Sequence, residues 1–116
     1  MQNISFEDFK KVDIRIGKII SAERLEDSNK LLKLQVDFGD DSSTNSGQAQ
    51  RQILAGIAKF YEPENLVGKF CPFVFNLAPK KMGEYESQGM ILAADDTGGP
   101  VLLHPDKDVK PGSIIK

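Results

Sequence analysis

The sequence predicts an all-β domain, a five-stranded barrel with one short helix between its third and fourth strands and flanking elements at both ends. Two observations support this prediction. Short runs with apolar residues at every second position recur along the chain, as in strands that bury one face. One helical pattern interrupts them at residues 58–68, where Pro63 suits a first turn and Gly68 suits a stop. With 116 residues, the chain is expected to form a single domain over residues 1–116.

A short helix is expected near the start of the chain, within residues 5–12. Ser5 is a suitable N-cap, with Asp8 three residues later as in a capping box. Phe6 and Phe9 lie three residues apart on one face of this helix. We therefore expect these two aromatic side chains to hold the helix in place.

Three strands are predicted next. Within residues 12–25 the apolar alternation changes phase at Gly17, which predicts a strand with a bulge or a sharp bend at that glycine. The second strand buries the even-numbered residues from 32 to 38. The third strand, residues 51–57, follows a nearly all-polar stretch at 40–50 that predicts a loop.

The second half of the chain supplies two more strands and an extended tail. Residues 69–77 form an aromatic-rich strand whose Pro72 lacks a backbone donor, which argues for an edge or a bulge there. Residues 88–95 form a fifth strand, and residues 101–104 and 109–115 form short extended pieces. Three strands, a helix and two strands is the order of an OB-fold barrel. A sandwich of two sheets is the alternative, and the position of the single helix favours the barrel.

The composition describes a globular chain, with 40% apolar and 28% charged residues. No apolar stretch approaches the ~20 residues that cross a bilayer, and the first residues lack a signal peptide's apolar core. We therefore expect a cytoplasmic protein without membrane contact. The net charge of −2 excludes a general attraction to polyanions, but basic side chains gather in residues 10–33 and 69–81. Local basic patches are compatible with this distribution.

The sequence offers little for catalysis. Cys71 is the single cysteine and lies in an apolar strand, which predicts a core thiol, and His104 is expected at the surface at the end of a strand. Cysteine and histidine spacings of zinc sites and glycine-rich phosphate loops are absent, and the paired carboxylates lie beside turn residues. We therefore predict no enzyme activity, no catalytic residue, no metal and no cofactor.

The basic residues converge on one side of the predicted barrel. OB-folds bind oligonucleotides on strands two and three, between the loops that follow strands one and four. The first loop ends at Lys30, and the second contains Lys80 and Lys81. Lys33 points outward on strand two, and Arg15 points outward on strand one. Such side chains contact phosphates without choosing a sequence. Ordinary solvation explains any single lysine better, whereas it explains the whole set only as well as phosphate binding does.

Five blocks of the sequence carry a specific resemblance. They are FEDFKKVDIRIGKIISAE, NKLLKLQVDFG, RQILAGIAKFYEPENLVGK, NLAPKKMGEYESQGMILAA and VLLHPDKDVKPGSII. In this order they resemble the tRNA-binding domain family. That family includes the C-terminal extension of many methionyl-tRNA synthetases, free-standing dimeric tRNA-binding proteins, the C-terminal module of the endothelial monocyte-activating polypeptide and a secretion-chaperone-like group.

The resemblance implies an OB-fold that binds tRNA through its shape and backbone rather than base identity, without catalysis. It implies tRNA as a partner, a homodimer and, for an appended domain, the catalytic chain of a methionyl-tRNA synthetase. The chain resembles either the free-standing form or an excised synthetase domain. A peptide-binding secretion-type chaperone on the same fold is the alternative function, and a purely structural dimerisation domain is a third.

The family's binding positions transfer to named residues of this chain. Asn76 and Ser87 are expected to donate to phosphate or ribose oxygens, whereas Met90 is explained equally well as a core residue. The sequence departs from the family in the long 40–50 loop and in Cys71–Pro72, which replaces an aliphatic run. The residues expected to contact tRNA by the resemblance, together with Arg15 from the charge pattern, are Lys30, Lys33, Asn76, Lys80, Lys81, Ser87, Gln88 and Met90.

Overall fold

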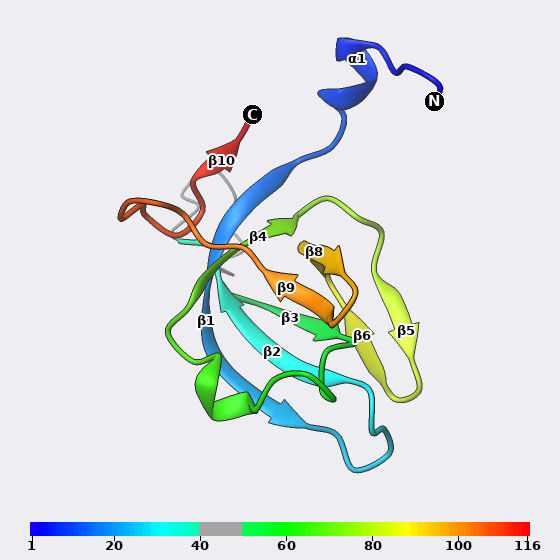
Figure 1. Ribbon diagram of the computed structural model, residues 1–116, viewed down its shortest axis with the longest axis vertical. Coiled ribbons are helices and arrows are strands. Elements are labelled where there is room, and N and C mark those ends of the chain that lie inside the picture. Colours follow the sequence, from blue (N-terminus) through cyan, green and yellow to red (C-terminus); the bar gives the residue numbers. More distant parts are fainter. Residues whose placement is uncertain (40–49) are drawn as a thin grey trace.

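β1 (Ile14–Arg24) is the central strand of the main sheet in this computed structural model, which describes residues 1–39 and 50–116 (Figure 1). Its second half pairs antiparallel with β2 (Leu32–Asp37), and its first half pairs antiparallel with β4 (Phe70–Val74). One strand therefore pairs in two directions, as the closing of a barrel requires.

The sheet extends from this centre in the order β3-β2-β1-β4-β7. β3 (Gln50–Ala55) pairs with β2, and β7 (Met90–Ile91) pairs with β4. The short strand β10 (Ile114–Ile115) pairs with the start of β1. The predicted loop at 40–50 lies outside the described residues except for Gln50, which begins β3.

Hydrogen bonds between the two edges of this sheet close the barrel. The backbone N–H of Gln88 donates to the carbonyl of Gln52 at 2.8 Å, and the N–H of Gln52 donates to Gln88 Oε1 at 3.0 Å. The N–H of Leu54 donates to Ser87 Oγ at 3.0 Å. These bonds join β3 to the residues that precede β7. The closed sheet confirms the predicted barrel rather than the sandwich.

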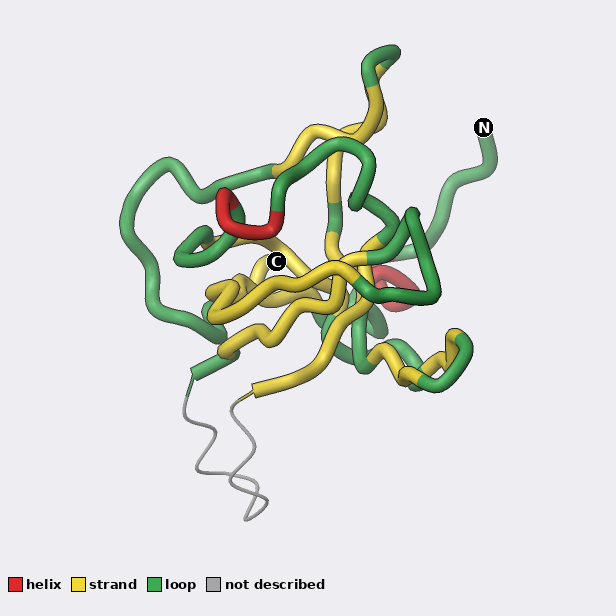
Figure 2. Tube along the Cα trace, turned by 90° about the horizontal axis from the view of Figure 1, so that it is seen from below, coloured by secondary structure: helices red, strands yellow, loops and turns green. Residues whose placement is uncertain are grey.

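The other elements are short. Figure 2 shows strands and their connecting loops along most of the tube, and the helical turns are α1 (Phe6–Phe9) and η1 (Pro63–Asn65). The predicted helix between strands three and four is thus a single 3-10 turn, with Pro63 in its first turn and Gly68 in the left-handed region beyond it. A hairpin of β8 (Ala93–Asp96) and β9 (Gly99–Leu102) follows the barrel strands.

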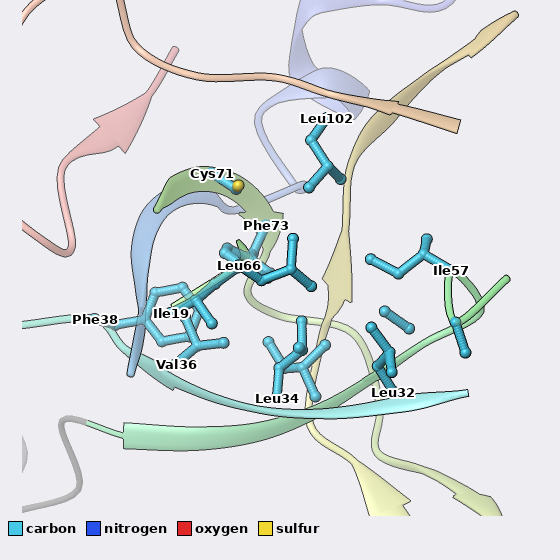
Figure 3. Packing of buried hydrophobic residues seen from close by; sticks show 13 residues of the cluster. Ile19, Leu32, Leu34, Val36, Phe38, Ile57, Leu66, Cys71, Phe73 and Leu102 are labelled. Atoms are coloured by element: carbon cyan, nitrogen blue, oxygen red, sulfur yellow. The ribbon is translucent and has the colours of Figure 1, made fainter. Parts of the chain in front are cut away.

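The core lies inside the barrel and follows the predicted alternation. Leu32, Leu34, Val36 and Phe38 are buried along β2, and Figure 3 shows them on the same side of the strand. They pack in one cluster with Phe73 and other apolar side chains. The edge of the Phe38 ring meets Phe73 with 5.5 Å between ring centroids. The sequence pattern alone therefore identified the face of β2 that builds the core.

The bulge in β1 lies three residues beyond the predicted position. The register between β1 and β2 shifts between Ile19 and Ser21, so Ile20 and not Gly17 is the extra residue. Gly17 has a different role, because it faces the barrel interior at close range. A Cβ on Gly17 would overlap Val36 Cγ1 and lie 2.8 Å from Phe38 Cε1. The glycine is therefore needed for packing where the strand bends.

Gly17→Ala is expected to lower the free energy of unfolding by about 1–3 kcal/mol, because the added methyl group must displace rigid core side chains. Urea denaturation measures this loss. Gly56→Ala is the matched control, since among the described residues nothing beyond its two chain neighbours lies within 4 Å of a Cβ placed there. Equal stability of the two variants would contradict the packing role of Gly17.

Two further expectations from the sequence are corrected by the structure. Phe6 and Phe9 are 70% and 39% exposed, so they do not hold α1 on the barrel of their own chain. Pro72 does not lie in an edge strand, because β4 pairs with both β1 and β7. The pairing with β7 covers only Phe73 and Val74 of β4. It stops before Pro72, which has no N–H to donate to β7.

Candidate nucleic-acid interface

The segment between β4 and β7 forms a hairpin and not only a loop. β5 (Lys80–Met82) and β6 (Tyr85–Ser87) pair antiparallel, with Lys80 opposite Ser87 and Lys81 opposite Glu86. Gly83 turns the chain with a φ of 65°, a conformation that favours glycine. Figure 1 shows this hairpin at the end of the barrel opposite both chain termini. The turn between β1 and β2 lies at the same end.

Lys80 and Lys81 are both exposed on β5, whereas the base of the hairpin is fastened to the barrel. The side chain of Gln52 donates to the carbonyl of Glu86 at 3.0 Å, next to the backbone bonds that close the barrel. The two lysines are thus carried on an element with a fixed attachment. Such an element presents cations to a ligand with little loss of conformational freedom on binding.

Ser87 is the last residue of β6, at the base of the hairpin, and is only 4% exposed. Its Oγ accepts the N–H of Leu54 at 3.0 Å and donates to the carbonyl of Gly89 at 2.9 Å. The hydrogen that Ser87 was expected to give to a phosphate is therefore used inside the protein. Gln88, whose Oε1 accepts the N–H of Gln52, has the same structural use.

Ser87→Ala is expected to lower the free energy of unfolding by about 1–3 kcal/mol, because the buried N–H of Leu54 loses its acceptor. Thermal or urea unfolding measures the loss. Ser21→Ala, at an exposed position of β1, is the control and is expected to stay within about 0.5 kcal/mol of the parent. Full stability of Ser87→Ala would show that the hydroxyl has no structural use.

Lys33 stands on the outer face of β2 beside the hairpin. Its Nζ lies 2.6 Å from Glu23 Oε1 and 5.6 Å from the centroid of the Tyr85 ring. The hydrogen bond with Glu23 raises the pKa of Lys33, so this side chain carries its charge throughout the neutral range. A phosphate at this position would share the lysine with Glu23.

Lys30 is exposed at the end of the turn between β1 and β2. Ser28 Oγ accepts the N–H groups of Lys30 and Leu31, each at 3.2 Å, and the carbonyl of Lys30 accepts the N–H of Ala58 at 3.0 Å. The backbone of Lys30 is therefore held while its side chain faces solvent. The turn between β1 and β2 and the β5–β6 hairpin lie at the same end of the molecule in Figure 1.

Arg15 and Asn76 are not gathered with these lysines. Asn76 Oδ1 accepts the N–H of Asp13 at 2.9 Å, and its Nδ2 donates to the carbonyl of Lys11 at 2.6 Å. Arg15 makes two hydrogen bonds to the carboxylate of Asp13, at 3.0 and 2.9 Å, and its guanidinium lies 4.0 Å from the centroid of the Phe75 ring. Both side chains fix the segment between α1 and β1 against the end of β4.

Arg51 is a residue of this region that the sequence reasoning missed. Its guanidinium lies 3.5 Å from the centroid of the Phe75 ring, and its Nη1 donates to the carbonyls of Phe75 and Gln88. Burial and the neighbouring charge of Arg15 lower its pKa. The sequence does contain an indication of this position. Arg51 lies two residues before Ile53 and four before Ala55, so all three share the inward face of β3.

Met90 is 45% exposed on β7, opposite Val74. The interpretation of Met90 as a core residue is therefore wrong. Leu77, between β4 and the hairpin, is also 45% exposed. Both apolar side chains are available at the surface. Phe75, in contrast, is half-buried between Arg15 and Arg51.

Cys71 and His104 lie close together without forming a catalytic pair. Cys71 Sγ is 3.7 Å from His104 Nδ1, and that nitrogen lies 2.9 Å from the carbonyl of Phe70, to which it can only donate. Nδ1 therefore carries a hydrogen and does not accept one from the thiol. Burial raises the pKa of Cys71 to about 11, which keeps the thiol protonated. Cys71 is the core thiol that the sequence predicted.

Within residues 1–39 and 50–116, histidine, cysteine and carboxylate side chains do not assemble in threes or more as metal ligands do. The helices of these residues are also too short and too polar to cross a membrane.

An apolar groove of about 560 Å³ lies at the end that carries the termini. We call it the terminal groove. Phe6, Phe9 and Val12 line it from the side of α1, and Ile114 and Ile115 line it from β10. α1 buries none of its residues, so this apolar surface has no cover within the described chain.

A family model and curated relatives both connect the chain with tRNA-binding domains and methionine–tRNA ligases. Residues 14–114 match the family model described as "Putative tRNA binding domain". The methionine–tRNA ligase of Archaeoglobus fulgidus is 49% identical over 114 residues, which are 98% of this chain but 16% of that enzyme. The ligase of Methanoregula boonei is 50% identical, with the same 16% of its length covered. The chain thus spans about a sixth of the length of these relatives.

Solved structures extend the similarity to full-length matches. A MetRS-related protein of Pyrococcus horikoshii is 35% identical with a TM-score of 0.87, and the match covers 100% of both chains. The chaperone CsaA of Bacillus anthracis is 32% identical with a TM-score of 0.84, over 99% of this chain and 100% of that one. Proteins with different names therefore share this barrel.

Proposed function

The chain belongs to the tRNA-binding domain family, and on that premise we propose that it binds tRNA through phosphate contacts at the β5–β6 hairpin and the outer face of β2. Recognition is by the shape and backbone of the RNA rather than by base identity. The domain itself carries out no reaction, and the buried, protonated Cys71 supports this assignment.

The position of Lys80 and Lys81 is the observation that carries this proposal. They are exposed on a hairpin whose base is bonded to the barrel and whose Tyr85 lies beside Lys33. The β1–β2 turn, which ends at Lys30, lies at the same end of the molecule as this hairpin (Figure 1). These four lysines supply cations for phosphate contacts in a chain whose net charge is −2. Lysine contacts to phosphate give affinity and salt dependence without sequence choice.

The predicted contact residues divide into two groups by what their polar atoms already bind. Asn76, Ser87 and Gln88 use their side chains within the protein, and Arg15 is paired with Asp13. We assign these four to positioning the hairpin and its base. We assign direct contact with tRNA to the exposed Lys30, Lys80, Lys81 and Met90, and to Lys33, whose ammonium keeps donors beside its bond to Glu23.

A homodimer is the second part of the proposal, with the terminal groove as its interface. The helix α1 has four residues, which is too short to be stable without tertiary contacts. Phe6 and Ile114 are 70% and 62% exposed, which is unusual for large apolar side chains gathered in one groove. A second copy related by a two-fold axis would cover the same surface on both partners. It would leave the hairpin, at the opposite end, open to RNA.

The similarity to methionine–tRNA ligases supports a proposal for the biological setting of the domain. The chain matches a sixth of each methionine–tRNA ligase, so the catalytic parts of those enzymes lie outside the matched region. We propose that this domain either is attached to a methionyl-tRNA synthetase chain or acts as a separate protein. In both cases it increases the hold on tRNA.

A salt titration of the unmodified protein tests the proposal. Fluorescence anisotropy with labelled total tRNA is expected to show binding that weakens linearly in log affinity against log salt. With four lysine contacts the expected slope is about −2.8 to −3.6, from about 0.7–0.9 for each phosphate. Absence of binding at low salt, or binding that salt does not change, would contradict the phosphate mechanism.

Peptide binding is the second candidate function. The similarity to the chaperone CsaA and the exposure of Met90 and Leu77 favour it, since methionine adapts to varied apolar partners. Phe75 does not contribute, because its ring is covered by two guanidinium groups. Suppression of the aggregation of a denatured model protein, without binding of tRNA in the titration above, would favour this function over the first.

A further inference from the structure

One arginine holds both ends of the segment that carries the hairpin. Arg51 Nη1 donates to the carbonyl of Phe75 at 2.6 Å and to the carbonyl of Gln88 at 3.3 Å. Phe75 is the last residue before residues 76–87, and Gln88 is the first residue after them. The two ends are therefore joined through one side chain of β3.

The guanidinium is itself held in a layered arrangement. The ring of Phe75 has Arg51 at 3.5 Å and Arg15 at 4.0 Å from its centroid. Arg15 is fixed by Asp13, and the carbonyl of Asp13 accepts the N–H of Phe75 at 2.7 Å. The edge of the Phe75 ring meets Phe38, with 5.0 Å between centroids, and this contact connects the layers to the core.

We propose that Arg51 is a positioning residue, which orders residues 76–87 so that the hairpin lysines are placed for tRNA before tRNA arrives. This proposal rests on the proposed function for its consequence, but the ordering itself concerns the free protein. Arg51 touches no RNA in this account. It acts through the two carbonyls and the aromatic ring.

An arginine is needed for this task on physical grounds. Its guanidinium is planar, so it stacks on Phe75 while its N–H groups donate to acceptors in the plane. Hydrogen bonds from a charged donor are stronger than those between neutral groups. A lysine would keep the charge, but it has no plane to stack and a single nitrogen on a flexible stem. The lowered pKa agrees with a charge withdrawn from solvent, and arginine remains protonated nonetheless.

Amide hydrogen exchange in the free protein tests the ordering. Arg51→Met keeps an unbranched apolar chain and removes both hydrogen bonds, and exchange in residues 76–88 is expected to accelerate by roughly tenfold to hundredfold. Arg51→Lys is expected to give nearly the same acceleration. The matched control is Arg24→Met, which also loses an arginine–carbonyl bond, to Ala58 at 2.8 Å, but away from the hairpin. Unchanged exchange in Arg51→Met would overturn the proposal.

The salt dependence of tRNA binding separates positioning from contact. Arg51→Met is expected to bind roughly tenfold more weakly at every salt concentration, with the slope of log affinity against log salt unchanged. A slope that falls by about 0.9 would make Arg51 a phosphate contact and would overturn the positioning role. If the parent protein fails to bind tRNA, the proposed function fails, whereas the exchange result still decides the ordering.

A measurement on the unsubstituted protein covers the case in which Arg51→Met does not fold. Nuclear magnetic resonance of arginine side chains is expected to show slowed rotation and slowed hydrogen exchange of the Arg51 guanidinium. Arg24, whose side chain is 46% exposed and whose guanidinium donates to the carbonyl of Ala58 without an aromatic stack among the described residues, serves as the internal comparison. Arg51 signals that are averaged like those of a free arginine would contradict the positioning role of Arg51.

Discussion

Replacing both Lys80 and Lys81 with alanine is expected to weaken tRNA binding strongly, with an effect that depends on salt. Each phosphate contact contributes about 0.7–0.9 to the slope of log affinity against log salt, so the double variant should lose about 1.4–1.8. By this slope, the loss of affinity at 0.1 M salt exceeds the loss at 1 M by roughly 25- to 60-fold. Anisotropy titrations of parent and variant over this salt range measure it.

The stability of this variant should be unchanged, because both side chains are exposed. The matched control is the double variant Lys107→Ala with Lys110→Ala, which changes the net charge equally at exposed positions away from the hairpin. The control is expected to retain the parent slope. Equal losses in the two variants would mean that the general charge of the chain, and not the hairpin, attracts the RNA.

Replacing Phe6 and Ile114 with serine is expected to convert a dimer into a monomer. Both side chains occur twice in a two-fold interface, and each loss costs about 1 kcal/mol or more. Four such losses raise the dimer dissociation constant roughly 1000-fold. Analytical ultracentrifugation over a concentration series measures this constant, and circular dichroism confirms that the barrel stays folded.

Val67→Ser provides the control for this variant. Val67 is 53% exposed but lies just after η1, outside the terminal groove. It should leave the association of the chain unchanged. A parent protein that is monomeric at all concentrations would contradict the dimer, and a dimer that survives the double substitution would place the interface elsewhere.

The barrel was predictable from the sequence because its strands bury one face. The even-numbered residues of β2 from Leu32 to Phe38 alternate without interruption, and all four are buried. This alternation repeats every two residues, whereas the side chains of a helix repeat every 3.6 residues. The order of the strands around the single turn at Pro63 then selected the OB-fold.

The hairpin was not predictable in the same way. β5 and β6 have three residues each, and KKM and YES contain too few apolar residues to show a period. Their pairing depends on Gly83 and on bonds to β3, which are far away in the sequence. The burial of Ser87 follows from the same tertiary contacts. A polar residue in a loop sequence is expected at the surface unless the fold supplies its partners.

The candidate contacts illustrate a related limit of sequence reasoning. Lysines at positions 30, 33, 80 and 81 agree with both the charge pattern and the family blocks, and the structure leaves each of them exposed or partly exposed. Asn76 agrees with the family blocks alone, and its amide joins Asp13 and Lys11. A motif thus marks positions that matter to a family, but it does not separate contact from support.

The central claim is that tRNA lies against the β5–β6 hairpin and the outer face of β2. Amide hydrogen exchange with and without saturating tRNA tests it most directly. Bound tRNA is expected to slow amide exchange in residues 80–87 and 30–35 and to leave exchange in α1 and β10 unchanged. Slowing confined to the terminal groove, with the hairpin unchanged, would contradict it.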